Sequence, residues 1–232
     1  YGTDGLPFEV DPRQVLVRVL DRCAEWDLTP VVATEMEFYL LKDGKAGANA
    51  APVPHVGSVG GIDPQHMYGM AELDELERFL ADLRQAAIMQ VLPVDTILSE
   101  AAVGQFEVNL NHRPDAMAAA EDAVLLRRLI SGVARRHGLK ASFMAKPFQD
   151  WPGNGMHVHV SLLDGTGSNV FANAETGQTR LGHAISGCLA TMPEALALFI
   201  NSFNGYRRLA PGSYAPTLAA WGGNHRSVAV RV

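Results

Sequence analysis

The feature that most limits how this 232-residue chain folds is a set of polar side chains placed two residues apart inside apolar segments. A β-strand points successive side chains to opposite faces, so residues two apart share one face. Three segments follow this pattern, and their polar members are Glu35 and Glu37, Glu107 and Asn109, and His157, His159 and Ser161. Glu100 lies seven residues before Glu107, across a short AAVG segment. The sequence therefore predicts three strands that each present a polar face.

Each polar stripe taken alone fits a solvated sheet face, because acidic residues are mostly exposed. The surrounding apolar residues favour a second interpretation. A carboxylate enters an apolar environment only with a partner, since desolvating it costs several kcal/mol. The strands themselves carry too few Lys or Arg residues to supply that partner. A divalent metal is the simplest counter-charge, and ligation rich in oxygen with one imidazole suits Mg²⁺ or Mn²⁺ better than structural zinc.

The order of helix-like and strand-like segments favours an α+β domain with a mainly antiparallel sheet. Apolar residues at helical spacing predict helices at 12–27, 70–90, 114–137, 178–191 and 193–202. Runs rich in β-branched residues predict strands at 31–41, 91–98, 104–111, 140–146, 156–163 and 226–232, with a loop at 43–66. Neighbouring strands are often joined by short loops, which favours antiparallel pairing over a doubly wound fold.

Composition excludes several classes of protein. The 47% content of hydrophobic residues excludes disorder, and a net charge of −6 without a basic run excludes sequence-independent binding of nucleic acid. Charged residues interrupt every apolar run before the roughly 18 residues of a membrane span, so we expect no membrane partner. Cys23 and Cys188 are too few for a disulfide framework. We expect a cytoplasmic protein, and because the first residue is Tyr1 we expect an excerpt of a longer chain.

A group of cations marks the last segment of the sequence. It comprises Arg207, Arg208, Arg226 and Arg231. The planar fork of arginine suits phosphate and carboxylate groups, and arginine beside a metal stabilises a transferring phosphoryl group. Surface salt bridges are the alternative interpretation. The sequence holds no P-loop and no GxGxxG motif, so a nucleotide would have to be held by metal and arginine.

The ordered motifs of the chain resemble the catalytic domain of glutamine synthetases. They are EMEF, SEAAVGQFEVNL, MAKP, GNGMHVHVSL, YRRLAPGSYAP and NHRSVAVRV. The segments MAKP, LPVDTILSE and WGG are similar in sequence to those of relatives that join glutamate to amines, the γ-glutamyl-polyamine and γ-glutamyl-ethanolamide ligases. The resemblance covers about residues 10–232. It implies a curved, mainly antiparallel sheet flanked by helices.

The resemblance also implies a reaction and its residues. ATP phosphorylates the γ-carboxylate of glutamate, and ammonia or an amine then displaces phosphate from γ-glutamyl phosphate. The first metal, Mg²⁺ or Mn²⁺, would take ligands from Glu37, Glu100 and Glu107, and the second from Glu35 and His157. The remaining positions that match are His159 and Ser161 against the nucleotide, Gly153 and Arg208 at glutamate, and Arg226 and Arg231 at the phosphates. Active sites in the family form between subunits of a large ring, so we expect a homo-oligomer.

The chain departs from the family pattern at several positions. Pro152 stands where the family has Asn before the glycine of the substrate loop, and His225 where it has Asn before the arginine. Tyr214 replaces the flap glutamate that helps to deprotonate ammonium, which favours an amine other than ammonia. The chain stops at Val232, before the family's last metal glutamate, and we expect the N-terminal β-grasp-like domain to be missing too. A catalytically silent relative and a two-metal hydrolase remain alternative functions.

Overall fold

The computed structural model describes residues 2–3, 5–42, 67–225 and 227–232. The helices are α1 (Pro12–Glu25), α2 (Met70–Glu75), α3 (Glu77–Met89), α4 (Ala116–Arg136), α5 (Gly177–Phe199) and α6 (Phe203–Tyr206). The strands are β1 (Leu28–Lys42), β2 (Val94–Ser99), β3 (Gln105–Leu110), β4 (Leu139–Ser142), β5 (Met156–Asp164), β6 (Trp221–Gly222) and β7 (Val230–Arg231). The loop predicted at 43–66 and the site residue Arg226 lie outside the described residues.

A five-stranded antiparallel sheet forms the centre of the molecule, in the order β2-β3-β1-β4, with the fifth strand, β5, also paired to β1. The central strand β1 is 15 residues long, which lets two strands share one of its edges. The first part of β1 pairs with β5, and its last four residues, 39–42, pair with β4. A separate pair, β6 and β7, is parallel. The predicted α+β class with a mainly antiparallel sheet is confirmed.

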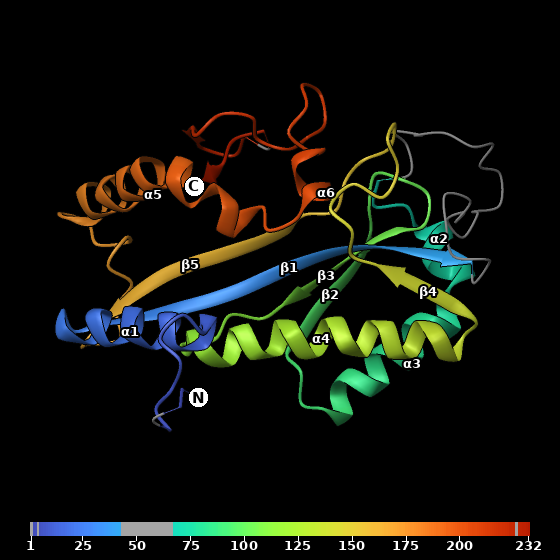
Figure 1. Cartoon of the computed structure of the whole chain (residues 1–232), viewed down its shortest axis with the longest axis horizontal. Helices are drawn as coiled ribbons and strands as arrows, with labels where there is room; N and C mark the ends of the chain where they lie inside the picture. Colours follow the sequence, from blue (N-terminus) through green and yellow to red (C-terminus); the bar gives the residue numbers. More distant parts are fainter. Residues whose placement is uncertain (1, 4, 43–66, 226) are drawn as a thin grey trace.

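Helices α3 and α4 cover one face of the sheet, while α5, α6 and the C-terminal tail lie on its other side (Figure 1). The hydrophobic core lies between the sheet and α3 and α4. Three alternate residues of β1, Met36, Phe38 and Leu40, point into it. Their contacts come from residues at helical spacing, such as Leu126 and Ile130 of α4. The alternation of β1 therefore directs these three side chains into this core and the odd-numbered ones to the opposite face, where a second, smaller apolar cluster lies.

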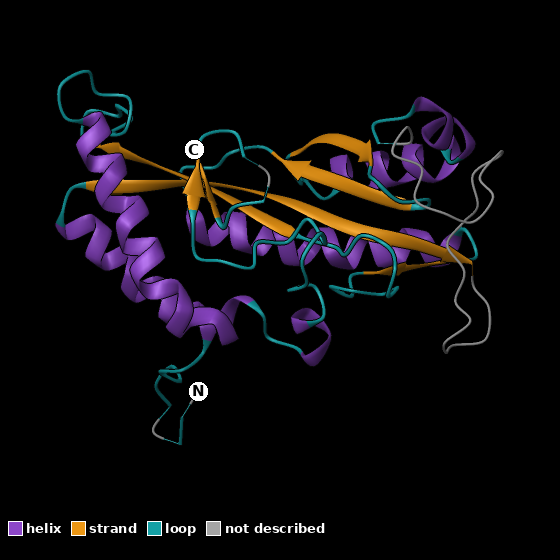
Figure 2. Ribbon diagram, turned by 90° about the horizontal axis from the view of Figure 1, so that it is seen from above, coloured by secondary structure: helices purple, strands orange, loops and turns teal. Residues whose placement is uncertain are grey.

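Local signals in the sequence explain where the helices begin. Asp11 caps α1 by accepting a hydrogen bond from the Arg13 amide at 2.9 Å, and Pro12 occupies the first helical position. Asp115 caps α4 in the same way, through the Ala118 amide at 3.0 Å. The view from above shows α4 running along the length of the sheet (Figure 2). No helix among the described residues combines the length and the apolar character needed to cross a membrane.

Some predicted boundaries were wrong. We expected two helices separated at Pro193, because proline removes a helical hydrogen bond. The structure has one helix, α5, with Pro193 inside it. The Leu, Ala and Met residues around that proline have high helix propensity, which offsets one lost bond. The predicted helix 70–90 divides at Leu76. The predicted strand 140–146 ends at Ser142, and the strand predicted at the C-terminus is only β7.

Candidate active site

The register of three strands brings the polar stripes together on one face of the sheet. Glu35 of β1 lies opposite His157 of β5 on one side and opposite Asn109 of β3 on the other. Glu37 lies opposite Glu107 of β3. Residues directly opposite each other in antiparallel strands have side chains about 5 Å apart. Pairing of β1 with both neighbours therefore builds a cluster of acidic and imidazole groups.

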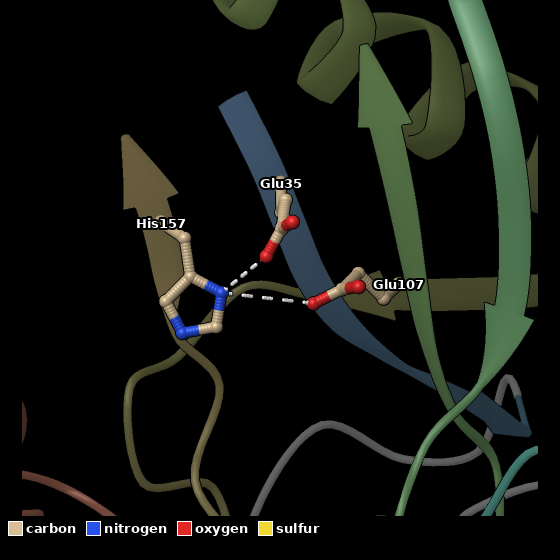
Figure 3. A group of neighbouring side chains, drawn as sticks. All are labelled: Glu35, Glu107 and His157. Atoms are coloured by element: carbon tan, nitrogen blue, oxygen red, sulfur yellow. Dashed lines mark hydrogen bonds and ion pairs between the residues drawn. The ribbon is translucent and has the colours of Figure 1, made fainter. Parts of the chain in front are cut away.

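Glu35, Glu107 and His157 point toward one another from β1, β3 and β5 (Figure 3). The Nδ1 atom of His157 lies 2.6 Å from Glu35 Oε2 and 3.9 Å from Glu107 Oε2. Each of the three side chains offers one ligand atom, and these atoms lie within 4.8 Å of one another. Two residues further along the same face of β5, His159 Nε2 lies 2.8 Å from Glu35 Oε1. Two carboxylates and an imidazole thus offer three possible metal ligands close to one another.

The surroundings shift the pKa values of the two carboxylates in this cluster in opposite directions. The hydrogen bond from His157 lowers the pKa of Glu35 to about 2 and raises the pKa of His157. Burial raises the pKa of Glu107 to about 7, and repulsion from Glu35, Glu100 and Glu37 adds to that rise. Glu107 is only 6% exposed. A buried carboxyl surrounded by three other carboxylates fits a divalent cation, because a cation would remove the repulsion that now favours the protonated form.

Glu37 lies beside this cluster and faces the segment before β5. Its Oε2 accepts hydrogen bonds from the Gly155 amide at 2.9 Å and from Gln105 Nε2 at 3.3 Å. Its negative charge attracts the guanidinium of Arg208, whose pKa is lowered by burial. Arg208, which follows α6 in the chain, therefore lies near Glu37 and beside the same segment before β5.

The segment from Pro152 to Gly155 packs closely against its surroundings. A Cβ atom on Gly153 would lie 2.3 Å from the Ala145 carbonyl oxygen and 2.8 Å from the Arg208 side chain. Glycine is therefore required at this position by the close approach of two other segments. The Tyr39 hydroxyl donates to the Pro152 carbonyl at 2.9 Å, and this bond is buried. The predicted substrate loop is a rigidly held piece of chain next to Glu37.

The other predicted site residues lie further from the cluster or in separate elements. Ser161 pairs with Val31, four residues along β5 from His157. Arg231 is exposed and belongs to β7, in the smaller sheet. Tyr214 is 68% exposed and adopts the left-handed conformation with φ 59°. Glu100 follows the end of β2, and its charge acts on Glu107.

Sequence reasoning missed two buried amides in the site. Gln105 and Asn154 are 1% and 5% exposed and hydrogen-bond to each other. A signal for Gln105 was present, because it precedes Glu107 by two residues and so extends the same polar stripe. Asn154 lies between two glycines in a loop, where strand periodicity gives no information.

Comparisons with known proteins identify the family. The family model for the glutamine synthetase catalytic domain matches residues 9–232. The gamma-glutamylputrescine synthetase PuuA of Escherichia coli is 38% identical over 231 residues, which are 99% of this chain and 49% of the relative. The glutamate–isopropylamine ligase of a Pseudomonas species is 31% identical, over 98% of this chain and 50% of the relative. The chain spans about half the length of the curated relatives it matches.

Solved structures give the same result. The GmaS–ADP complex has a TM-score of 0.83 and 30% identity, and the match covers 98% of this chain and 53% of that one. Glutamine synthetase of Plasmodium falciparum has a TM-score of 0.80 at 18% identity, covering 100% and 50% of the two chains, and so supports the fold alone. The match of the family model over nearly the whole chain agrees with the motifs and with the site described above. This chain belongs to the glutamine synthetase catalytic-domain family.

Proposed function

We propose that the whole protein is an ATP-dependent ligase that joins the γ-carboxylate of glutamate to an amine through γ-glutamyl phosphate. The observation that carries the proposal is the convergence of Glu35, Glu107 and His157 next to Glu37 and Arg208. A site of this kind combines a place for divalent cations with a cation for the substrate carboxylate. These are the parts that phosphoryl transfer to a carboxylate needs, since that reaction depends on positioning and charge stabilisation.

In this proposal Mg²⁺ or Mn²⁺ is held by the acidic stripe. Glu37, Glu100 and Glu107 would hold a first ion, and Glu35 and His157 a second. Bound there, the ions would supply positive charge that offsets the phosphate charge of ATP near the γ-carboxylate of glutamate. The raised pKa of Glu107 means that this residue must lose a proton before it can act as a ligand.

The substrates are held by the remaining residues of the site. His159 and Ser161 lie against the nucleotide on β5, and Arg226 and Arg231 steady its phosphates. The solved complex of GmaS with ADP supports a nucleotide site in this fold. Gly153 and Arg208 receive glutamate, and Arg208 suits a carboxylate because its planar guanidinium can donate two parallel hydrogen bonds.

We propose an amine larger than ammonia as the second substrate. PuuA is named for putrescine and the Pseudomonas relative for isopropylamine. Tyr214 supports the same choice, since a neutral phenol cannot attract ammonium as a carboxylate does. Tyr214→Glu should therefore raise the rate with ammonia relative to the rate with putrescine, measured as phosphate release. An unchanged ratio would remove Tyr214 from the argument.

The proposal extends to assembly and location. This chain would be part of a catalytic domain that continues in the whole protein, with a β-grasp-like domain before it. Subunits would form a homo-oligomeric ring, as expected in the family, and work in the cytoplasm on its ATP and glutamate. Mass photometry of the full-length protein would measure the size of that ring.

Phosphate release from the full-length protein tests the ligase activity. The assay combines ATP, Mg²⁺ and glutamate with ammonia, putrescine, spermidine, ethanolamine or an aromatic amine, one at a time. We expect release that requires glutamate and one of the amines together, and its loss in Glu107→Ala. Glu77→Ala changes an exposed glutamate of α3 and is the matched control. Release without glutamate, or full activity in Glu107→Ala, would contradict the proposal.

A catalytically silent relative is the second candidate. Tyr214 and Pro152 favour it, because they replace the family's flap glutamate and substrate-loop asparagine. A fold can persist after its chemistry is lost. This candidate predicts that the full-length protein binds ATP with Mg²⁺ by calorimetry and releases no phosphate with any amine of the screen.

A further inference from the structure

Gln105 connects the two halves of the candidate site. It lies at the start of β3, opposite Tyr39 of β1, on the sheet face that carries Glu37 and Glu107. Its Nε2 atom lies within hydrogen-bond distance of three acceptors: Glu37 Oε2 at 3.3 Å, the Gly153 carbonyl at 3.1 Å and Asn154 Oδ1 at 3.2 Å. A carboxylate and a carbonyl can only accept, so the nitrogen end of the amide must face them.

Other buried hydrogen bonds hold the segment that Gln105 contacts. Asn154 Nδ2 donates to the carbonyls of Ser142 at 3.1 Å and Met144 at 2.9 Å, and the Asn154 amide donates to the Ala145 carbonyl at 2.9 Å. These bonds fasten Asn154 to the chain that leaves β4. Gly153 and Gly155 on either side of it therefore have fixed positions.

Glu37 is oriented by the same contacts. Its Oε2 accepts from both Gln105 and the Gly155 amide, while the Glu37 backbone amide donates to the Gly155 carbonyl at 3.2 Å. Its Oε1 lies 3.1 Å from where a Cβ atom of Gly155 would be, so both oxygens of the carboxylate lie against this segment. Two donors on Oε2 therefore fix the orientation of the Glu37 carboxylate relative to the Gly153–Gly155 segment.

We propose that Gln105 is a positioning residue that fixes the carboxylate of Glu37 and the Gly153–Gly155 segment relative to each other, so that the metal ligand and the glutamate-binding loop are held by one amide. This inference rests on the proposed function of those two parts. Gln105 is too deeply buried to touch a substrate, and it acts through Glu37 and Gly153. Groups that orient a metal ligand in this way commonly change metal affinity by about 10- to 100-fold.

The test uses the full-length protein and two binding measurements that need no turnover. Mn²⁺ affinity is measured by electron paramagnetic resonance without nucleotide, and glutamate affinity by calorimetry in excess Mn²⁺. Gln105→Met keeps the side-chain volume and removes the donor. We expect Mn²⁺ affinity to fall about 10-fold or more, and glutamate affinity to fall with it.

Two further variants separate positioning from general destabilisation. Tyr39→Phe removes the hydrogen bond to Pro152 and leaves the contacts of Glu37 in place. It should weaken glutamate binding while Mn²⁺ affinity stays within twofold of wild type. Ile130→Val removes one methylene-sized group from the core on the other face of the sheet, so it lowers stability without touching the site. It should change neither affinity by more than twofold.

The outcomes distinguish this inference from the ligase proposal. Both affinities within twofold of wild type in Gln105→Met, or equal losses in Ile130→Val, would overturn the positioning role. If Gln105→Met fails to fold, Gln105→Glu takes its place under the same criteria, because it keeps the shape and replaces the donor by an acceptor. If Gln105→Met lowers both affinities as expected but the wild-type protein never releases phosphate, the ligase activity alone would be refuted.

Discussion

The substitution Glu107→Gln should stabilise the metal-free protein and weaken its stabilisation by metal. Glu107 is buried beside Glu35, Glu37 and Glu100, and these surroundings raise its pKa from 4.5 to about 7. At pH 8 the residue is ionised in both the folded and the unfolded state. The folded state then carries the full cost of a desolvated, repelled carboxylate. Glutamine has nearly the same shape and no charge, so it avoids that cost.

The pKa values set the size and the pH range of the effect. A difference between 4.5 and about 7 corresponds to about 3 kcal/mol, at about 1.4 kcal/mol for each pKa unit. Protonation of Glu107 favours the folded state, so its contribution is present below pH 4.5 and is lost as pH rises through 7. The advantage of Glu107→Gln should therefore be greatest at pH 8 and vanish near pH 4.5. It corresponds to roughly 6 to 12 °C in the melting temperature for a domain of this size.

Thermal unfolding between pH 4.5 and 8, with and without Mn²⁺, measures both effects. Wild type should gain stability from Mn²⁺ at pH 8, whereas Glu107→Gln should gain much less, because the ion loses a charged ligand. Glu77→Gln, on the exposed surface of α3, controls for the loss of a negative charge. A metal-free Glu107→Gln protein that melts at or below the wild-type temperature at pH 8 would refute this account of the site.

Three other substitutions test separate parts of the structure. Gly153→Ala should weaken glutamate binding more than 10-fold by calorimetry, because the new Cβ would lie 2.3 Å from the Ala145 carbonyl; unchanged binding would show that the segment yields freely. Arg208→Lys should raise the KM for glutamate about 10-fold, since lysine offers a point charge in place of a two-pronged donor, and an unchanged KM would contradict that contact. Leu126→Ala, in the fully buried core, should lower the free energy of urea unfolding by about 2 to 5 kcal/mol with the metal affinity unaltered; a loss under 1 kcal/mol would contradict the packing described.

The fold class could be predicted because it follows from local patterns. Period two in EMEF, FEVNL and MHVHVSL predicts which side chains of each strand share a face, and the structure confirms those faces through the register of β1 with β3 and β5. Local patterns do not predict which strand pairs with which. Nothing local to Glu35 indicates that His157 lies opposite it, 122 residues away. That proximity depends on tertiary pairing and became an expectation only through the family resemblance.

The parts that sequence reasoning missed depend on long-range contacts. Gln105 and Asn154 hydrogen-bond each other between β3 and a loop, so their burial depends on a contact between segments that are distant in the sequence. The continuation of α5 through Pro193 likewise depends on the propensity of a long helix outweighing one local signal. Periodicity identifies candidate faces, whereas buried amides and helix continuity are decided by what packs against them.

The acidic face of β1 is stable because the opposite face of the same strand is the hydrophobic core. Met36, Phe38 and Leu40 are each buried, at about 1.5 to 3 kcal/mol for a large apolar side chain. Their combined contribution to stability exceeds the roughly 3 kcal/mol by which the ionised Glu107, on the neighbouring strand β3, destabilises the folded state. A strand with apolar residues on both faces would be more stable, but it would offer no ligands. The alternation Glu-Met-Glu-Phe therefore fixes the carboxylates in place with the packing of their immediate neighbours, so core and site are built from one segment.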